Sequence, residues 1–167
     1  MRIKRSSSLT EQEKHQLLSW GDDIFHTEEL ELMWRPKESH LILYIGDRPV
    51  THCGLITQSI NVGDSSFLVG GVGGVVTAPD FQGRGYAHQI LQEALTIFAL
   101  EERPAALLFC REALQPFYHQ QNWQLIPDPV WILQSSGLVQ FPACTMVHTL
   151  NGFSWPDGPL KIDSLPW

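Results

Sequence analysis

Cysteine is rare in this sequence, and long apolar runs are absent. The three cysteines, Cys53, Cys110 and Cys144, are odd in number and have neither CxxC nor zinc-ligand spacing, which argues against a disulfide framework and against a metal site. No window approaches the roughly 20 apolar residues of a membrane span, and the N-terminal residues lack the apolar stretch of a signal peptide. We therefore expect a soluble, cytoplasmic protein that has core thiols and neither a metal nor a membrane partner.

Positive charge is also scarce, with 11 Lys and Arg against 18 Asp and Glu and a net charge of −7. Binding to nucleic acid normally requires clustered Lys and Arg, so this balance argues against a nucleic-acid partner. An acidic chain suits a cationic substrate, although acidity also serves solubility alone. No repeat or low-complexity tract interrupts the chain, and its 43% hydrophobic content suffices for one domain over residues 1–167.

The most informative stretch that is present runs from Gly74 to Phe98. It begins with a short apolar run, passes through a glycine-punctuated turn, and continues with apolar residues spaced three and four apart. That spacing marks one face of a helix, so the stretch predicts a strand, a glycine loop and a helix. The apolar face consists of Ala87, Ile90, Leu91, Ala94, Leu95 and Phe98.

The loop Gln82–Ala87 predicts an anion site, because small residues let backbone N–H groups at a helix N-terminus converge on a phosphate. The loop lacks the GK[ST] of a P-loop and the third glycine of a dinucleotide-binding fingerprint, so neither nucleotide motif is satisfied. The alternative is a glycine-rich turn that merely starts a helix.

A second block follows the loop along the chain. Ala105–Cys110 is a short apolar run typical of a buried strand, and Glu112–Trp123 then contains Pro-Phe-Tyr-x-x-x-Asn-Trp. The loop fits the pattern Q/R-x-x-G-x-G/A, and the two blocks together resemble the GNAT (Gcn5-related N-acetyltransferase) superfamily. Glycine is usual there at the position of Asn122, and Asn is the next best residue for a left-handed helix C-cap.

This resemblance implies acetyl-CoA as the cosubstrate. In the superfamily the loop amides bind the pyrophosphate, and the preceding strand lies against the pantetheine arm. Carried over by position, the cofactor-binding residues would be Val75, Val76, Thr77, Gln82, Gly83, Arg84, Gly85, Tyr86 and Ala87. The superfamily's helix in the second block aims a tyrosine hydroxyl at the thioester sulfur, which makes Tyr118 the expected general acid.

The resemblance also implies an α+β fold, with a mixed, mostly antiparallel sheet of six to seven strands that is splayed in the middle and has helices on both faces. The residues themselves predict a strand within 1–8 and a helix from the Thr10–Glu13 capping box to about Trp20 or Phe25. Asn151–Trp167 has neither period, and we expect it to pack on the sheet edge. Further strands are expected at His40–Ile45, Val50–Ile60, Ser65–Thr77, Trp123–Leu133 and Thr145–Leu150.

Glycines are concentrated inside one of these expected strands, at Gly70–Gly74. Glycine weakens strand pairing and often marks a bulge or a close backbone approach. A bulge here would splay the strand away from the next one, and in the superfamily such splaying makes the slot for the pantetheine arm.

The acid-rich segment 22–34 corresponds to the region that walls the acceptor site in the superfamily. Its carboxylates could hold an amine, and the alternative is a solvated acidic face. The expected substrate-binding residues are Glu28, Glu29, Glu31, Trp34 and Trp167.

Within the superfamily the sequence most resembles aminoglycoside 2′-N-acetyltransferases, through the glycine-rich approach to the loop, the Pro-Phe-Tyr block and an aromatic extension that ends in Trp167. In that group the terminal Trp and its carboxylate reach the aminoglycoside site. One departure is Gly73, which aligns with the acidic residue that relays the amine's proton. Thr51–Gln92 also resembles bacterial N-acyltransferases that acylate chitin-oligosaccharide signals.

We therefore expect direct transfer of an acetyl group from acetyl-CoA to a primary amine of a small, cationic, aminoglycoside-like molecule. A backbone N–H at Val76 or nearby would hold the thioester oxygen. The alternatives are a longer acyl group, or a CoA-binding sensor that has lost its acceptor, and a homodimer is left open. Candidate bases by their ordinary pKa, although lone histidines are more often structural, are His26, His52, His119 and His148.

Overall fold

The computed structural model describes residues 1–167, which form one ten-stranded sheet with three α-helices. The strands are β1 (Arg2–Ser6), β2 (Ser39–Ile45), β3 (Arg48–Val62), β4 (Ser65–Thr77), β5 (Ala105–Cys110), β6 (Gln124–Leu125), β7 (Val130–Gln134), β8 (Gly137–Gln140), β9 (Cys144–Thr149) and β10 (Leu160–Ile162). The helices are α1 (Glu11–Leu18), α2 (Tyr86–Leu100) and α3 (Gln115–His119), with short 3₁₀ turns at η1 (Glu28–Leu30), η2 (Pro79–Phe81) and η3 (Glu112–Leu114).

Strand β3 organises the sheet, because it pairs antiparallel with β2, β4 and β10. The main order is β6-β9-β5-β4-β3-β10-β7-β8, and β1 extends β2 at one side. Only the β4–β5 and β10–β7 pairs are parallel. The expected α+β class with a mixed, mostly antiparallel sheet is confirmed, although the sheet has ten strands in place of six to seven.

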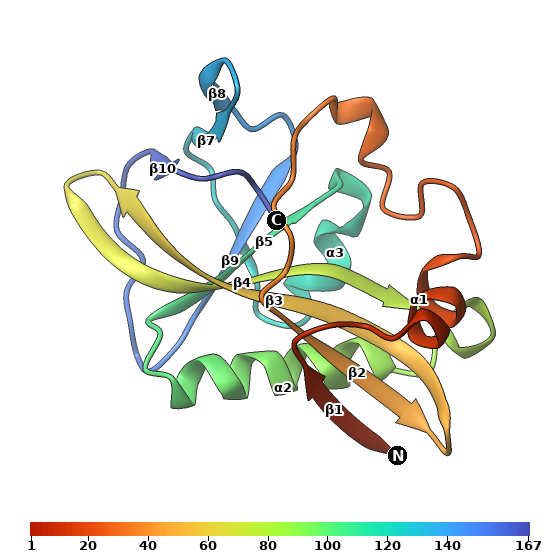
Figure 1. Ribbon diagram of the computed structural model, residues 1–167. Coiled ribbons are helices and arrows are strands. Elements are labelled where there is room, and N and C mark those ends of the chain that lie inside the picture. Colours follow the sequence, from red (N-terminus) through yellow and green to blue (C-terminus); the bar gives the residue numbers. More distant parts are fainter.

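Helices cover both faces of the sheet, as expected, and Figure 1 shows α2 lying along one of them. Alternating residues of β2 separate the two faces. Leu41 and Leu43 belong to the core cluster that includes the buried side chains of α2 and Tyr118 of α3. Ile42 points to the opposite face, where Leu17 of α1 is fully buried.

The C-terminal third departs from the expected strands. The interval 123–133 is not one strand, because Pro127 and Pro129 cannot donate to a sheet ladder and they separate β6 from β7. Ser135 and Ser136 form the turn of the β7–β8 hairpin. The segment expected to lack a period contains β10, whose three residues pair with β7 and whose first two, Leu160 and Lys161, also pair with β3.

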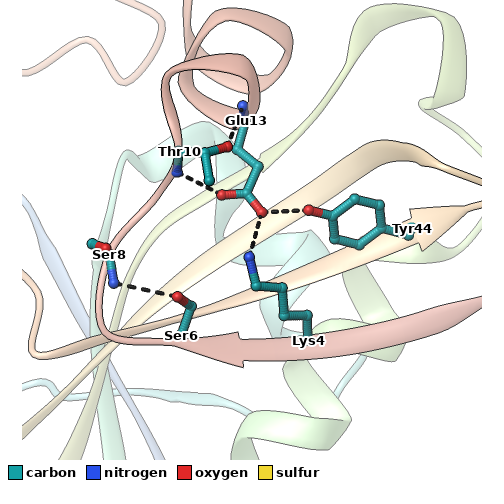
Figure 2. A network of polar contacts seen from close by, with 6 residues as sticks. All are labelled: Lys4, Ser6, Ser8, Thr10, Glu13 and Tyr44. Carbon is teal, nitrogen blue, oxygen red and sulfur yellow. Dashed lines mark hydrogen bonds and ion pairs between the residues drawn. The ribbon is translucent and has the colours of Figure 1, made fainter.

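Helix α1 begins at the expected capping box and ends at Leu18, earlier than predicted. Thr10 accepts a hydrogen bond from the Glu13 N–H, and the Glu13 carboxylate accepts one from the Thr10 N–H. Figure 2 shows that the same carboxylate also accepts hydrogen bonds from the ammonium group of Lys4 of β1, at 2.9 Å, and from the hydroxyl of Tyr44 of β2. One buried carboxylate therefore joins α1 to two strands. None of the helices is long and apolar enough to cross a membrane.

Candidate functional site

A cleft opens where β4 and β5 separate. The parallel ladder between these strands covers only Gly70–Val72 and Ala106–Leu108, and β4 continues beyond it as far as Thr77 without pairing to β5. A cavity of about 650 Å³ occupies the space between the diverging strands. Its lining residues are Trp20, Ile24, Phe25, Thr27, Trp34, Lys37, Val72, Gly73, Gly74, Val75, Val76, Thr77, Gln82, Leu108, Phe109, Cys110, Arg111, Leu114, Tyr118 and Trp167.

A bulge in β4 produces the divergence, as the glycine-rich stretch predicted. His52 of β3 is paired with Val76 and Gly54 with Gly73, so β4 has one residue more than β3 across this interval. Gly74 lies inside the bulge with φ of 59°, a left-handed conformation that favours glycine.

A buried histidine holds this bulge. His52 Nδ1 lies 2.7 Å from the Gly74 carbonyl oxygen, and His52 Nε2 lies 2.9 Å from Nδ1 of His40. A carbonyl only accepts, so His52 donates from Nδ1 and, when neutral, accepts at Nε2 from His40. Burial lowers the pKa of His52 to about 4, although the hydrogen bond to Gly74 raises it. The ring is therefore neutral near pH 7, and its contacts fix the Gly74 carbonyl.

The backbone of Thr77 faces the cleft. Ala78 N–H donates to the Val50 carbonyl at 2.9 Å, and the alternation of antiparallel pairs then turns the polar backbone groups of Val76 toward β3 and those of Thr77 away from it. The Gln82 side chain donates to the Thr77 carbonyl at 3.1 Å, which agrees with this direction. The register therefore favours Thr77 over Val76 as the donor that was expected at Val76 or nearby.

The glycine loop leads directly into α2. Gly83 and Gly85 have φ of 71° and 79°, and Gly85 is the N-cap residue of α2, whose first turn has no side-chain cap. The first N–H groups of a helix have no partner within the helix, so an uncapped N-terminus suits an anion. Gln82 lines the cavity, whereas the expected phosphate-binding residues from Gly83 to Ala87 lie just beyond it at the start of α2.

Tyr118 lies on the opposite side of the cleft from β4. It follows β5 on the short helix α3, is 5% exposed, and lines the cavity. Burial, together with the nearby thiols of Cys110 and Cys53, raises the pKa of its hydroxyl well above the usual range. The hydroxyl is thus protonated at neutral pH and available as a donor. Asn122 has φ of 63°, which confirms the left-handed cap predicted for the end of this helix.

Aromatic side chains form the other end of the cavity. Trp34 packs edge-on against Phe109 and Phe141, with ring centroids 6.4 and 6.2 Å apart. Trp167 is 3% exposed, and its ring centroid lies 4.8 Å from that of Phe109. The two tryptophans that were expected at the acceptor site therefore both line the cavity.

The acidic residues that were expected at the acceptor site do not line the cavity. Glu28, Glu29 and Glu31 lie on or next to η1, are exposed, and are absent from the cavity lining, which contains no carboxylate side chain. The local reason is Asp23, whose carboxylate accepts from the N–H groups of Thr27 and Glu28 and closes a turn that directs this segment outward. The alternative of a solvated acidic face fits these three residues better.

Two cationic residues of the cavity were missed by the sequence reasoning. Lys37 and Arg111 line it, and no ion pair of the chain involves either. Burial and the charge of Arg35 lower the pKa of Lys37 to about 8. The only sequence signal for Lys37 was the absence of side chains at Gly54 and Gly73. None of the four candidate histidines, His26, His52, His119 and His148, lines the cavity, and no group of three metal-ligating side chains occurs.

Known structures share this fold. A GCN5-related N-acetyltransferase from Kribbella flavida matches with TM-score 0.53 and 15% identity over 74% of this chain and 34% of that one, so this chain spans about a third of its length. A GNAT family N-acetyltransferase from Escherichia coli in complex with CoA has TM-score 0.58, 13% identity, and coverage of 97% and 90%. A GNAT family acetyltransferase from Brucella melitensis in complex with acetyl-CoA has TM-score 0.55 and 10% identity, over 95% of this chain and 94% of that one.

At these identities the structures show the fold alone, and a search of curated proteins found no match. The sequence itself goes further, because residues 5–126 match the family described as an acetyltransferase (GNAT) domain. That interval runs from β1 to the residue just after β6 and includes the β4 bulge, the glycine loop and Tyr118. The chain therefore belongs to the GNAT acetyltransferase family.

Proposed function

We propose that this chain transfers an acetyl group from acetyl-CoA to a primary amine by direct attack. The observation that carries the proposal is the splayed cleft, in which an outward-facing strand backbone and a protonated tyrosine lie on opposite sides of one cavity. The two GNAT structures with CoA and acetyl-CoA support the choice of cosubstrate. Val75–Thr77 would hold the pantetheine arm, and the loop from Gln82 to Ala87 would hold the pyrophosphate.

The chemistry needs three things from the cleft. The neutral amine nitrogen attacks the thioester carbon, and the carbonyl oxygen that becomes negative needs an N–H donor, which the Thr77 backbone or the bulge would supply. The carbon–sulfur bond then breaks, and the departing thiolate takes a proton, which Tyr118 would donate. The amine nitrogen loses its extra proton to water or to a base.

The acceptor is a separate part of the proposal. The aromatic residues Trp34 and Trp167 favour a small molecule with an apolar surface. For the expected cationic, aminoglycoside-like acceptor, the cavity offers no carboxylate side chain, and its charged lining side chains are those of Lys37 and Arg111, although the main-chain carboxyl group of Trp167 lies beside Gly73. An amine without excess positive charge fits these residues better.

The decisive experiment measures thiol release from acetyl-CoA with a panel of small amines, using the full chain and its Tyr118→Phe variant. Phenylalanine keeps the ring, which packs against Trp123 with centroids 6.2 Å apart, and removes only the hydroxyl. If Tyr118 is the general acid, kcat should fall by about 10²-fold to 10⁴-fold, with little change in the KM for acetyl-CoA. Tyr44→Phe is the matched control, because that hydroxyl bonds Glu13 away from the cleft.

A loss smaller than about threefold in Tyr118→Phe, in an assay limited by chemistry, would mean that water protonates the thiolate. Release with a longer acyl-CoA but not with acetyl-CoA would identify the acyltransferase alternative. Tight CoA binding without release for any amine would identify the sensor alternative.

A further inference from the structure

Two of the three cysteines face each other across the β5–β9 ladder. Cys110, the last residue of β5, is the direct partner of Cys144, the first residue of β9. Directly opposed residues of an antiparallel pair lie on the same face of the sheet, and both cysteines pack in the core cluster that contains Tyr118. Both are free thiols. The fold therefore brings together two thiols that are 34 positions apart in the chain.

The register sets the distance between the two residues. The Ile126 N–H donates to the Thr145 carbonyl at 3.0 Å, so the polar backbone groups of Thr145 face β6 and those of the neighbouring Cys144 face β5. Cys110 and Cys144 are thus a hydrogen-bonded pair, whose Cα atoms lie about 5.5 Å apart. Disulfides span Cα distances of about 4.4–6.8 Å, so a bond between these cysteines needs no change of register.

A disulfide at this position is nevertheless strained. The Cβ atoms of directly opposed residues lie about 4.5–5.5 Å apart, with hydrogen-bonded pairs at the longer end, whereas a disulfide needs about 3.5–4.5 Å. The two strand ends must therefore approach each other by about 1 Å. Strain makes a disulfide easier to reduce, which is typical of regulatory disulfides and not of structural ones.

Both thiols are connected to Tyr118, the proposed general acid. Cys110 lines the cleft together with Tyr118 and is close enough to contribute to the raised pKa of its hydroxyl. Cys144 Sγ accepts a hydrogen bond from the Gln115 side chain at 2.9 Å, and Gln115 is the first residue of α3, the helix that carries Tyr118. A shift of either sulfur therefore changes the contacts that position the tyrosine.

The two thiols differ in how accessible they are to a reagent. Cys110 is 8% exposed, and burial raises the pKa of its thiol to about 12, so it is a poor first nucleophile. Cys144 is half-buried and lines a second pocket, of about 240 Å³, which shares no residue with the cleft. A small disulfide in solution therefore meets Cys144 first.

We propose that Cys110 and Cys144 form a reversible disulfide, by exchange with a small-molecule disulfide, and that this bond displaces Tyr118 and lowers the activity. The effect on activity rests on the proposed acetyltransferase function, whereas the formation of the disulfide does not.

The exchange has two steps. The thiolate of Cys144 attacks one sulfur of oxidised glutathione, and one glutathione thiolate leaves. Cys110 then loses its proton and attacks the Cys144 sulfur, and the second glutathione thiolate leaves. Two thiols of the chain are oxidised, the reagent is reduced to two thiols, and the two cysteine protons pass to the leaving thiolates.

The first test needs no turnover. The full chain is equilibrated with mixtures of reduced and oxidised glutathione, the remaining thiols are alkylated after unfolding, and the products are mapped by mass spectrometry. We expect a Cys110–Cys144 link that dithiothreitol removes. Cys144→Ser, whose hydroxyl can still accept from Gln115, should form no link, whereas Cys53→Ala should form it as the parent does. A parent that keeps both thiols in oxidised glutathione, or that carries only bound glutathione, would overturn the inference.

The second test measures activity after the glutathione has been removed, with acetyl transfer followed by loss of the thioester. In the oxidised parent kcat should fall by about 10-fold to 100-fold, because a displacement of about 1 Å at a catalytic group costs up to about 10²-fold. Dithiothreitol should restore it, and Cys144→Ser should keep the kcat of the reduced parent with or without prior oxidation.

Equal kcat for the oxidised and reduced parent would show that the disulfide leaves Tyr118 in place, and the proposed control of activity would be wrong. If the link forms and is removed by dithiothreitol while the reduced chain acetylates no amine, the disulfide stands and the acetyltransferase proposal fails.

Discussion

At the scale of single residues, the glycines of β4 leave space that side chains from other elements fill. A Cβ atom on Gly70 would lie 2.4 Å from the ring of Phe98 of α2, and one on Gly71 would lie 2.5 Å from the indole of Trp167. Gly73 makes room for Lys37 in the same way. Neighbouring glycines of β4 thus let Phe98 of α2 pack closely on one face of the strand and let side chains that line the cleft, such as Trp167, pack closely on the other.

His52 is the residue whose loss should affect the bulge most directly. His52→Phe keeps a ring of similar size but leaves the Gly74 carbonyl without its donor. Losing a buried hydrogen bond costs about 1–3 kcal/mol, so kcat/KM for acetyl-CoA should fall roughly 5-fold to 150-fold. His15→Phe, on the exposed surface of α1, is the matched control.

The pH dependence gives an independent check on His52. Its folded pKa of about 4 is depressed from the ordinary 6.5, so the contribution of the neutral ring is complete above pH 6.5 and is lost as the pH falls toward 4. The parent should lose free energy of unfolding in urea across that window, beyond what the variant loses, and its kcat/KM should fall only as the pH approaches 4, where the ring of the folded protein takes up a proton. A variant with the parent's rate and pH profile would show that the bulge does not need His52.

At the scale of elements, the start of α2 should decide CoA affinity through charge. Gly85→Asn and Gly85→Asp have the same size, and both residues tolerate a left-handed backbone such as the φ of 79° found here. No other atom lies within 4 Å of an added Cβ at this position. The two variants therefore differ in charge alone.

Calorimetry with CoA should show Gly85→Asp binding about 10-fold to 100-fold more weakly than Gly85→Asn, because the carboxylate repels the pyrophosphate at close range. Similar affinities for the two variants would place the phosphates elsewhere and would return the glycine loop to a turn that only starts a helix.

At the scale of the whole molecule, the carboxylate of Glu13 should set the stability of the fold in acid. Burial alone would raise the pKa of Glu13, but hydrogen bonds from Tyr44, the Thr10 backbone and Lys4 outweigh it and lower the pKa from the ordinary 4.5 to about 2. A depressed folded pKa gives stability that is present above pH 4.5 and is lost as the pH falls through 2. The shift corresponds to at most about 3 kcal/mol.

Urea unfolding of the parent between pH 7 and pH 2 should therefore show a falling free energy of unfolding below pH 4.5. Glu13→Gln should be less stable at pH 7 and should lose much less stability in acid. Glu11→Gln, whose carboxylate pairs with Lys14 on the surface, should behave like the parent. Parallel curves for the parent and Glu13→Gln would show that the contacts of Glu13 with β1 and β2 contribute little to the free energy of unfolding.

Features that depend on residues close together in the chain could be predicted from the sequence alone. The capping box at Thr10, the left-handed cap at Asn122, the apolar face of α2 and the glycine loop before it each depend on residues a few positions apart. The order of these signals was enough to predict the family and the splayed, mixed sheet. Tyr118 could be placed at the cleft because its strand and helix are adjacent in the chain.

The chemistry at the tryptophan-lined end of the cavity depends on contacts between segments that are distant in the chain. Segment 35–37 meets the far end of the chain there, where the Arg35 N–H donates to the Pro166 carbonyl at 2.8 Å, and Figure 1 shows the C-terminus beside this segment. Lys37 reaches the cavity because two glycines from different strands are opposed, and that register cannot be read from either strand alone. Composition suggested a carboxylate site for a cation. Packing between distant segments put a lysine there and left the glutamates in solvent, because burial depends on which surfaces meet and not on which charges are nearby in the chain.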